Sequence, residues 1–131
     1  MKLILPPLVR RPFLDGEDPT HATYRFSCGS CHSAITITFS EILHAAWGWK
    51  DKTAEPERTT LAAMFHIDLA RRSIADGMDA VVRSSCPKCG AVHFSHFWFH
   101  EYRNSVYQIS IRAIAFHDQA EQDATTNNKI A

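Results

Sequence analysis

The sequence lacks an excess of charge of either sign. Its 131 residues include 14 Lys and Arg and 14 Asp and Glu, so the formal net charge at pH 7 is zero. The two signs are interspersed along the chain rather than gathered in blocks. This balance argues against a partner held mainly by charge, such as duplex DNA, RNA or an anionic membrane surface.

Long hydrophobic runs are also missing. Only Leu3, Ile4 and Leu5 precede the first proline pair, whereas a signal peptide needs an apolar stretch of roughly 7 to 15 residues. The densest apolar stretch, Ala91 to Phe99, is interrupted by two histidines and is far shorter than the roughly 20 residues that span a bilayer. We therefore expect a soluble, cytoplasmic protein whose thiols stay reduced.

Signatures of common catalytic sites are absent as well. The chain has no Gly-rich phosphate loop, nucleophile elbow or Ser-His-Asp signature. It has no H-x-E motif, and Ser85 stands where a zinc deaminase would have proline. A hydrolase or nuclease could draw only on a small set of His and Asp residues: His66, Asp68, His117 and Asp118. We expect a protein that is not an enzyme.

Alternating apolar and polar residues predict several strands. Residues 23–27 and 34–39 should form a hairpin. Further strands are expected at 80–83, at 91–102 and at 107–113, the last with one face exposed to water.

Two helices are predicted between these strands. Ser40 is expected to cap a short helix over 41–47, and the polar stretch 48–57 should interrupt the order. The longer helix is expected from Thr60 to Asp76, with Thr59 or Thr60 as its N-terminal cap and Gly77 as its C-terminal cap.

The two ends of the chain have a different composition. Residues 1–20 hold four of the six prolines, so we expect an extended, loop-rich arm rather than a helix. The tail 119–131 has one large apolar residue and is expected to be disordered. The length suits one domain, which we place at 1–118 as a single zinc-binding domain that includes the arm.

Two Cys-x-x-Cys turns, separated by residues 32–85, are the most informative motif. Each turn can present two sulfurs to one ion, and two turns complete a tetrahedral site. The second turn is stiffened by Pro87, and Gly90 permits the positive φ that such turns need. The best fit is one structural Zn²⁺ per chain, although a cage of four sulfurs also accepts iron. The expected ligands are Cys28, Cys31, Cys86 and Cys89.

On these residues the chain resembles the zinc-ribbon group and, more distantly, rubredoxin-type iron sites, which share the Cys-Pro-x-Cys-Gly turn found at 86–90. The resemblance is limited to the two turns and their flanking strands. It implies that the four cysteines bind the metal and that a small antiparallel sheet surrounds the ion. The sequence departs from the pattern at His32, where glycine is usual, and in the long separation between the turns. The fold class expected is α+β, a small antiparallel zinc-ribbon sheet with a helical insertion between the two Cys-x-x-Cys turns, which we call the knuckles.

Two other cysteine chemistries compete with this interpretation. Residues 28–32 match the C-x-x-C-H attachment motif of c-type haem, but that attachment normally follows export. A dithiol redox site needs a C-x-x-C at the start of a helix, whereas strands are predicted beside both pairs.

Because four thiolates close the coordination shell, the metal should not activate water. The surface must then carry the function, and aromatic residues with histidine are favoured at interface centres. On a strand, His96, Trp98 and His100 share one face, although such histidines more often fringe a core. The expected partner-binding residues are Trp47, Trp49, His96, Trp98 and His100.

The predicted function is a non-catalytic zinc-ribbon module that recognises another protein as an adaptor, regulator or inhibitor. The alternative is a nucleic-acid-binding or transcription-regulating ribbon. That alternative requires basic residues to converge on one face beside the aromatics. The residues in question are Arg10, Arg11, Arg71, Arg72, Arg83, Lys88 and Arg103.

Overall fold

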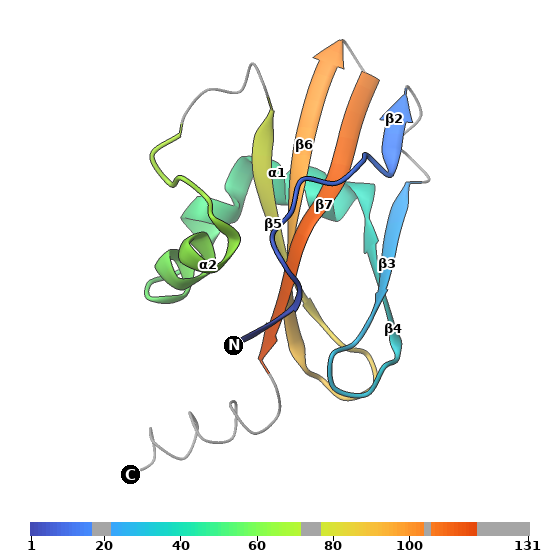
Figure 1. Ribbon diagram of the computed structural model, residues 1–131, viewed down its shortest axis with the longest axis vertical. Coiled ribbons are helices and arrows are strands. Elements are labelled where there is room, and N and C mark those ends of the chain that lie inside the picture. The colour runs from blue at the N-terminus through green and yellow to red at the C-terminus, as the bar shows by residue number, and fades with distance from the viewer. Residues whose placement is uncertain (17–21, 72–76, 104–105, 118–131) are drawn as a thin grey trace.

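The computed structural model describes residues 1–16, 22–71, 77–103 and 106–117. It is a mixed structure of mostly antiparallel strands with two helices (Figure 1), as expected for a small α+β fold. The elements are β1 (Lys2–Leu5), β2 (Leu14–Gly16), β3 (Thr23–Ser27), β4 (Ala34–Thr38), α1 (Phe39–Lys52), α2 (Glu57–Phe65), β5 (Met78–Ser85), β6 (Val92–Arg103) and β7 (Val106–His117).

The larger sheet has the order β1-β7-β6-β5, and every neighbouring pair in it is antiparallel. The N-terminal arm is extended and contributes both β1 and β2. These two strands pair with different stretches of β7, through Leu3 opposite Ala115 and Asp15 opposite Gln108. The arm therefore covers one edge of the sheet.

A separate two-stranded sheet is formed by β3 and β4, which confirms the expected hairpin. Burial alternates along β4, so that Ile35 and Ile37 point inward while the flanking threonines and alanine stay exposed. This alternation is the signature of a strand that lies over a core with one face in water.

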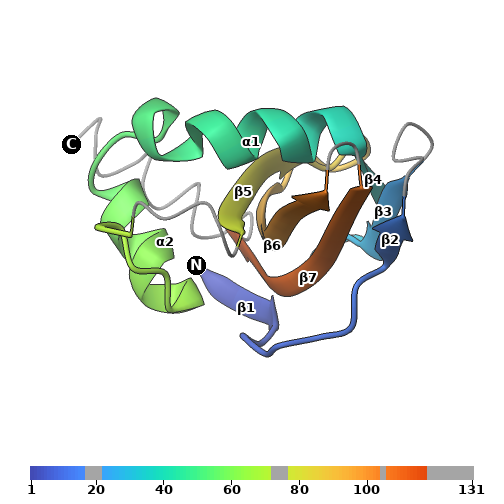
Figure 2. The same cartoon turned by 90° about the horizontal axis from the view of Figure 1, so that it is seen from above.

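Two apolar clusters pack between the sheets and the helices. The first joins α1 and β4 to the large sheet through Ile37, Ile42, Ala46, Ala80, Val82, Phe97, Phe99, Ile109, Ile111 and Ile114. The second joins the end of α1, the second half of α2 and the residue Ile67 after it to the sheet through Trp49, Leu61, Ala62, Phe65, Ile67, Val81, Val92, Phe94, Ala113 and Ala115. Figure 2 shows α1 along one side of the sheet, with α2 at the end remote from β2, β3 and β4.

Helix α1 is twice as long as the sequence indicated. Thr38, rather than Ser40, is its cap, and a reciprocal pair of hydrogen bonds joins Thr38 to Glu41. The helix continues through the stretch expected to break it because Trp49 is buried in the second cluster, and Lys50 and Lys52 favour the negative end of the helix dipole.

Helix α2 begins and ends earlier than predicted. It stops at Phe65 because His66 adopts a left-handed conformation with φ of 58°, which turns the chain away from the helix axis. Ile67 and Leu69 still pack on the second cluster, but from non-helical backbone. Residues 72–76 of the predicted helix lie outside the described residues. Gly77, expected as a helix cap, directly precedes β5 instead, with φ of 115°.

Strand β7 does not have the exposed face expected of it. Ser110 is 4% exposed, since both faces of the strand are covered. The alternation also breaks at Arg112: His96 lies opposite Ala113 and Phe97 opposite Ile111, so that Arg112 is an extra residue in the strand. Such a β-bulge redirects a side chain.

Candidate metal centre

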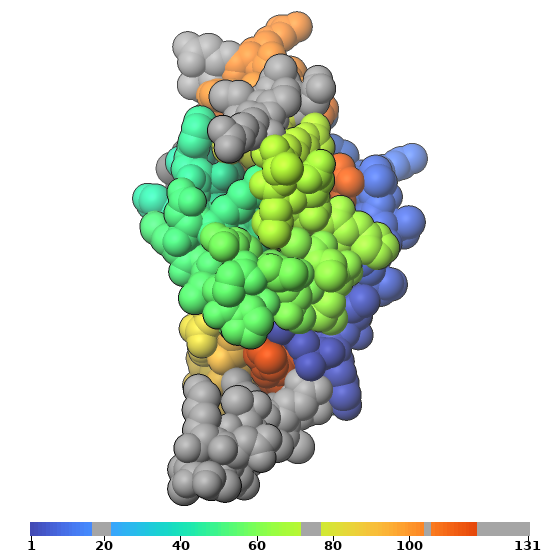
Figure 3. All heavy atoms as spheres, turned by 90° about the vertical axis from the view of Figure 1, so that its left-hand side faces the viewer, coloured from blue at the N-terminus to red at the C-terminus, as the bar shows by residue number. Residues whose placement is uncertain are grey.

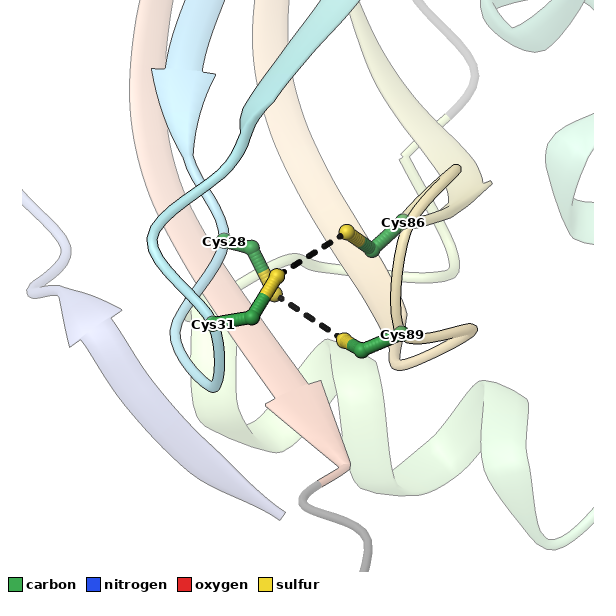
Figure 4. Close-up of side chains that lie close together, drawn as sticks. All are labelled: Cys28, Cys31, Cys86 and Cys89. Atoms are coloured by element: carbon green, nitrogen blue, oxygen red, sulfur yellow. Dashed lines mark hydrogen bonds between the residues drawn. The ribbon is translucent and has the colours of Figure 1, made fainter.

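The four cysteines converge from two turns that lie far apart in the sequence (Figure 4). The β3–β4 turn carries Cys28 and Cys31, and the β5–β6 turn carries Cys86 and Cys89. All four sulfurs lie within 4.8 Å of one another. The Sγ atoms of Cys28 and Cys89 are 3.6 Å apart, and those of Cys31 and Cys86 are 3.5 Å apart.

These separations are those of metal ligands rather than of disulfides. A disulfide brings the sulfurs to about 2.05 Å, whereas a tetrahedral zinc with bonds of about 2.3 Å holds them about 3.8 Å apart. The cluster can therefore accept a metal ion at its centre with small adjustments of the side chains.

The two knuckles have the same backbone hydrogen bonds. In the first, Cys28 N–H donates to the Ser33 carbonyl and His32 N–H donates to the Cys28 carbonyl. In the second, Cys86 N–H donates to the Ala91 carbonyl and Gly90 N–H donates to the Cys86 carbonyl.

The residue after the second cysteine is left-handed in both knuckles. His32 has φ of 64° and Gly90 has φ of 78°. His32 therefore stands where zinc ribbons usually have glycine, but its backbone keeps the same left-handed conformation. That conformation is strained for a residue with a side chain.

A buried histidine joins the two knuckles. His93 is fully buried, and its Nδ1 lies 3.0 Å from the Ala91 carbonyl, while Gly29 N–H donates to its Nε2 at 3.1 Å. Because Nε2 accepts, the imidazole is neutral with its proton on Nδ1. Burial lowers the pKa of His93, and the hydrogen bond to Ala91 opposes that change. The ring also stacks on Phe116.

Gly29 is needed where the first knuckle meets this histidine. A Cβ at that position would lie 2.8 Å from the ring of Phe116. The knuckle can therefore approach β7 closely only because residue 29 has no side chain.

The thiols occupy unequal environments. Hydrogen bonds from Ser33, first from its side chain and then from its backbone, lower the pKa of Cys31 to about 6. At Cys89 the backbone hydrogen bond with Ala91 lowers the pKa, but burial and the other three cysteines outweigh it and raise the pKa to about 11. Because thiolates this close repel one another, a divalent cation favours their ionisation, and binding releases protons.

Of the five residues predicted to bind a partner, the structure leaves only Trp47 largely exposed, at 65%. Trp49 was wrongly placed on that surface: it is 3% exposed, because α1 continues past residue 47 and turns it into the second cluster. His96 is 6% exposed and bonds to Asp79, whereas Trp98 and His100 are half-buried.

A cavity of about 330 Å³ lies beside two of these residues, His96 and Trp98. It was not foreseen, because its walls come from the arm, from the end of α2 and from three strands. The ionisable residues around it are His66, Asp68, Arg71, Asp79, His96 and Arg112. The hints in the sequence were His96 and Trp98 of the predicted partner surface, Arg71 of the nucleic-acid hypothesis, and the pair His66 and Asp68.

The four candidate hydrolase residues do not form one site within the described residues. His66 and Asp68 line the cavity, whereas His117 lies at the end of β7 opposite Val92 and packs against Phe94. Asp118 falls outside the described residues.

No family model, curated protein or solved structure matches the chain. Neither helix in the described part of the chain is long and apolar enough to cross a membrane.

Proposed function

We propose that the four cysteines bind one zinc ion and that this zinc is structural, in the manner of a zinc ribbon. Four sulfurs within 4.8 Å of one another, with two pairs 3.5 and 3.6 Å apart, support the proposal. With all four positions taken by protein, a zinc ion there would stabilise the fold and would not activate water. A ligand set made only of thiolates also suits a reducing compartment such as the cytoplasm.

Metal identity is tested on reduced protein purified without added metal. Elemental analysis should give one zinc per chain, and the protein should be colourless. One iron per chain, with the visible absorption of an iron–thiolate centre, would replace zinc with a rubredoxin-type site.

We further propose that the domain recognises another protein through the surface around the N-terminal arm. The supporting observation is the exposure of two consecutive apolar residues, Leu8 at 62% and Val9 at 74%, in a segment anchored to the sheet. Leu8 N–H donates to the Arg112 carbonyl, so these side chains are presented from a fixed backbone. Pre-ordered apolar side chains beside an aromatic residue, here Trp98, have the composition of an interface centre.

Nucleic-acid binding is the second candidate, because two arginines lie beside Trp98 and a third contacts the backbone of one of them. Arg71 and Arg112 both lie over the Trp98 ring, and Arg10 donates to the Arg112 carbonyl. Two carboxylates, Asp68 and Asp79, line the same cavity and weaken the local positive potential, which favours the protein partner.

Site-specific photocrosslinking distinguishes the two candidates. A photoreactive residue at position 9 should capture one defined protein from nuclease-treated source lysate, and the same residue at exposed position 36 on β4 should not. Capture should be lost in Leu8→Asp and retained in Thr36→Asp. Material that disappears after nuclease treatment and is released steeply by salt would favour nucleic acid instead.

A further inference from the structure

The cavity combines an apolar wall with an unusual group of charges. Its apolar wall includes Leu8 and Val9 of the arm and Phe65 at the end of α2. Figure 3 shows the corresponding side of the molecule, where α2 and the segment after it lie against the arm. A volume of about 330 Å³ equals roughly eleven water molecules at about 30 Å³ each, enough for a small organic molecule.

Arg112 reaches this cavity because of the β-bulge. The bulged carbonyl accepts hydrogen bonds from Leu8 N–H at 3.1 Å and from the Arg10 side chain at 2.6 Å, which hold the arm against β7. The guanidinium is half-buried, and no described residue accepts a hydrogen bond from its buried Nε. An unpaired buried donor of this kind is destabilising, so its retention needs an explanation.

A second guanidinium shares the same indole. Arg71 lies 4.7 Å and Arg112 lies 5.3 Å from the centre of the Trp98 ring. The indole is held against Gly77, where a Cβ would come within 2.6 Å of it. Both guanidinium groups therefore lie beside the indole in the wall of the cavity, and an anion bound there would be attracted to both.

Burial lowers the pKa of Arg112 and the nearby Asp79 carboxylate raises it, so Asp79 supplies part of the opposite charge, but the same carboxylate also bonds to His96. The Asp79 carboxylate lies 2.7 Å from Nε2 of His96, and since a carboxylate can only accept, Nε2 carries the proton. Asp68 likewise accepts a hydrogen bond from the Ala70 amide. Nδ1 of His96, a side chain that is 6% exposed, has no partner among the described residues.

We infer that this cavity binds an organic anion, whose carboxylate or phosphate head is recognised by Arg71 and Arg112 and whose apolar body lies against Leu8, Val9 and Phe65. The planar donors of arginine match both oxyanions. The anion has two possible sources, a free small molecule or the terminal carboxylate of a protein partner. The inference stands on the cavity and does not need the proposed protein interface.

The test uses the zinc-loaded full chain and three matched probes: benzoate, phenyl phosphate and the neutral benzyl alcohol. Binding is followed by NMR at the indole N–H of Trp98, assigned with Trp98→Phe. We expect saturable shifts with at least one anion and at least tenfold weaker binding of benzyl alcohol.

Arg112→Gln should weaken anion binding at least tenfold, which corresponds to about 1.4 kcal/mol. Because Arg112 is half-buried and that variant could misfold, Arg71→Gln at an exposed position is a second test and should weaken binding severalfold. Arg25→Gln, on exposed β3 outside the cavity, is the matched control and should bind like the wild type.

Three results would overturn the inference. These are no saturable shift with either anion up to about 10 mM, equal binding of benzyl alcohol, or equal weakening by Arg25→Gln and the cavity variants.

Short apolar peptides with a free or an amidated C-terminus then distinguish the two sources of the anion. Tighter binding of the free carboxylate indicates a partner chain, and no preference indicates a small molecule. Failure of the crosslinking experiment with retained benzoate binding would reject the protein interface and leave the anion site.

Discussion

The cysteine cluster and the cavity are both built from distant parts of the chain, but they are assembled by different means. Each knuckle is a self-contained turn with its own hydrogen bonds, and the two turns need only to meet. The cavity depends on five segments at once: the arm, the end of α2 with the residues after it, β5, β6 and β7. It also needs the bulge in β7 and the left-handed residue His66 that ends α2. Local chemistry thus dictates the first region, and packing dictates the second.

Loss of the metal should have the largest effect. Structural zinc contributes roughly 10 to 16 kcal/mol in zinc-finger peptides, whereas a whole domain is stable by about 5 to 15 kcal/mol. We expect Cys86→Ser to lose zinc and most of its cooperative thermal unfolding, while exposed Ser85→Ala keeps both. A Cys86→Ser protein with unchanged metal content and melting temperature would contradict the proposed centre.

Shortening a buried side chain in or just after α2 should destabilise the fold without affecting the cysteine cluster. Leu61 is fully buried in the second cluster, so Leu61→Ala should lower the free energy of unfolding by about 2–5 kcal/mol in urea titrations. Half-buried Leu69→Ala should cost less. Because neither residue contacts the cysteine cluster, zinc affinity should not change. An equal loss of zinc affinity and stability would show that the regions are not independent.

His93 should make the contact between the knuckles sensitive to acid. Its pKa is lowered in the folded protein by burial, so protonation favours the unfolded chain, whose histidines titrate near about 6.5. The stabilisation is complete above that pH and is lost as the pH falls toward the lower folded-state pKa. Unfolding free energies measured from pH 7.5 to pH 5 should fall less steeply for His93→Gln than for the wild type.

The control for this experiment is His44→Gln, which removes an exposed imidazole from α1. Protonation of the cysteines affects every variant alike, so the comparison isolates His93. Identical slopes for His93→Gln and the wild type would exclude the histidine as a pH-dependent contact.

The smallest expected effects come from changing the left-handed residue of each knuckle. His32→Gly should relieve left-handed strain and raise stability by up to about 1 kcal/mol, and Gly90→Ala should lower it by about the same amount. A Cβ at residue 90 would meet nothing within 4 Å, so the loss would come from the backbone alone. Thermal melting of both variants in zinc-loaded form is the measurement. Changes of the same sign would show that the knuckles are not conformationally equivalent.

Much of the fold follows from short-range patterns in the sequence. The β3–β4 hairpin and the strands that flank the second knuckle were predicted because alternation and turn residues act over a few positions. The sequence indicated roughly where both helices lie, but not the residues at which they begin and end. Thr38 caps α1 through its contact with Glu41, and burial of Trp49 extends the helix, whereas the left-handed His66 ends α2 early.

The sequence by itself determined which four cysteines come together: cysteine spacing restricts each turn to a geometry that presents two sulfurs, and such a cage of thiolates suits zinc or iron. Only the tertiary structure decided what surrounds His96, Trp98 and Arg112. A side chain's environment there depends on which segments pack over it, and no periodicity reveals that the arm covers β7 or that a bulge redirects Arg112. Long-range packing is collective, whereas a metal knuckle is local, and the two regions differ in predictability for that reason.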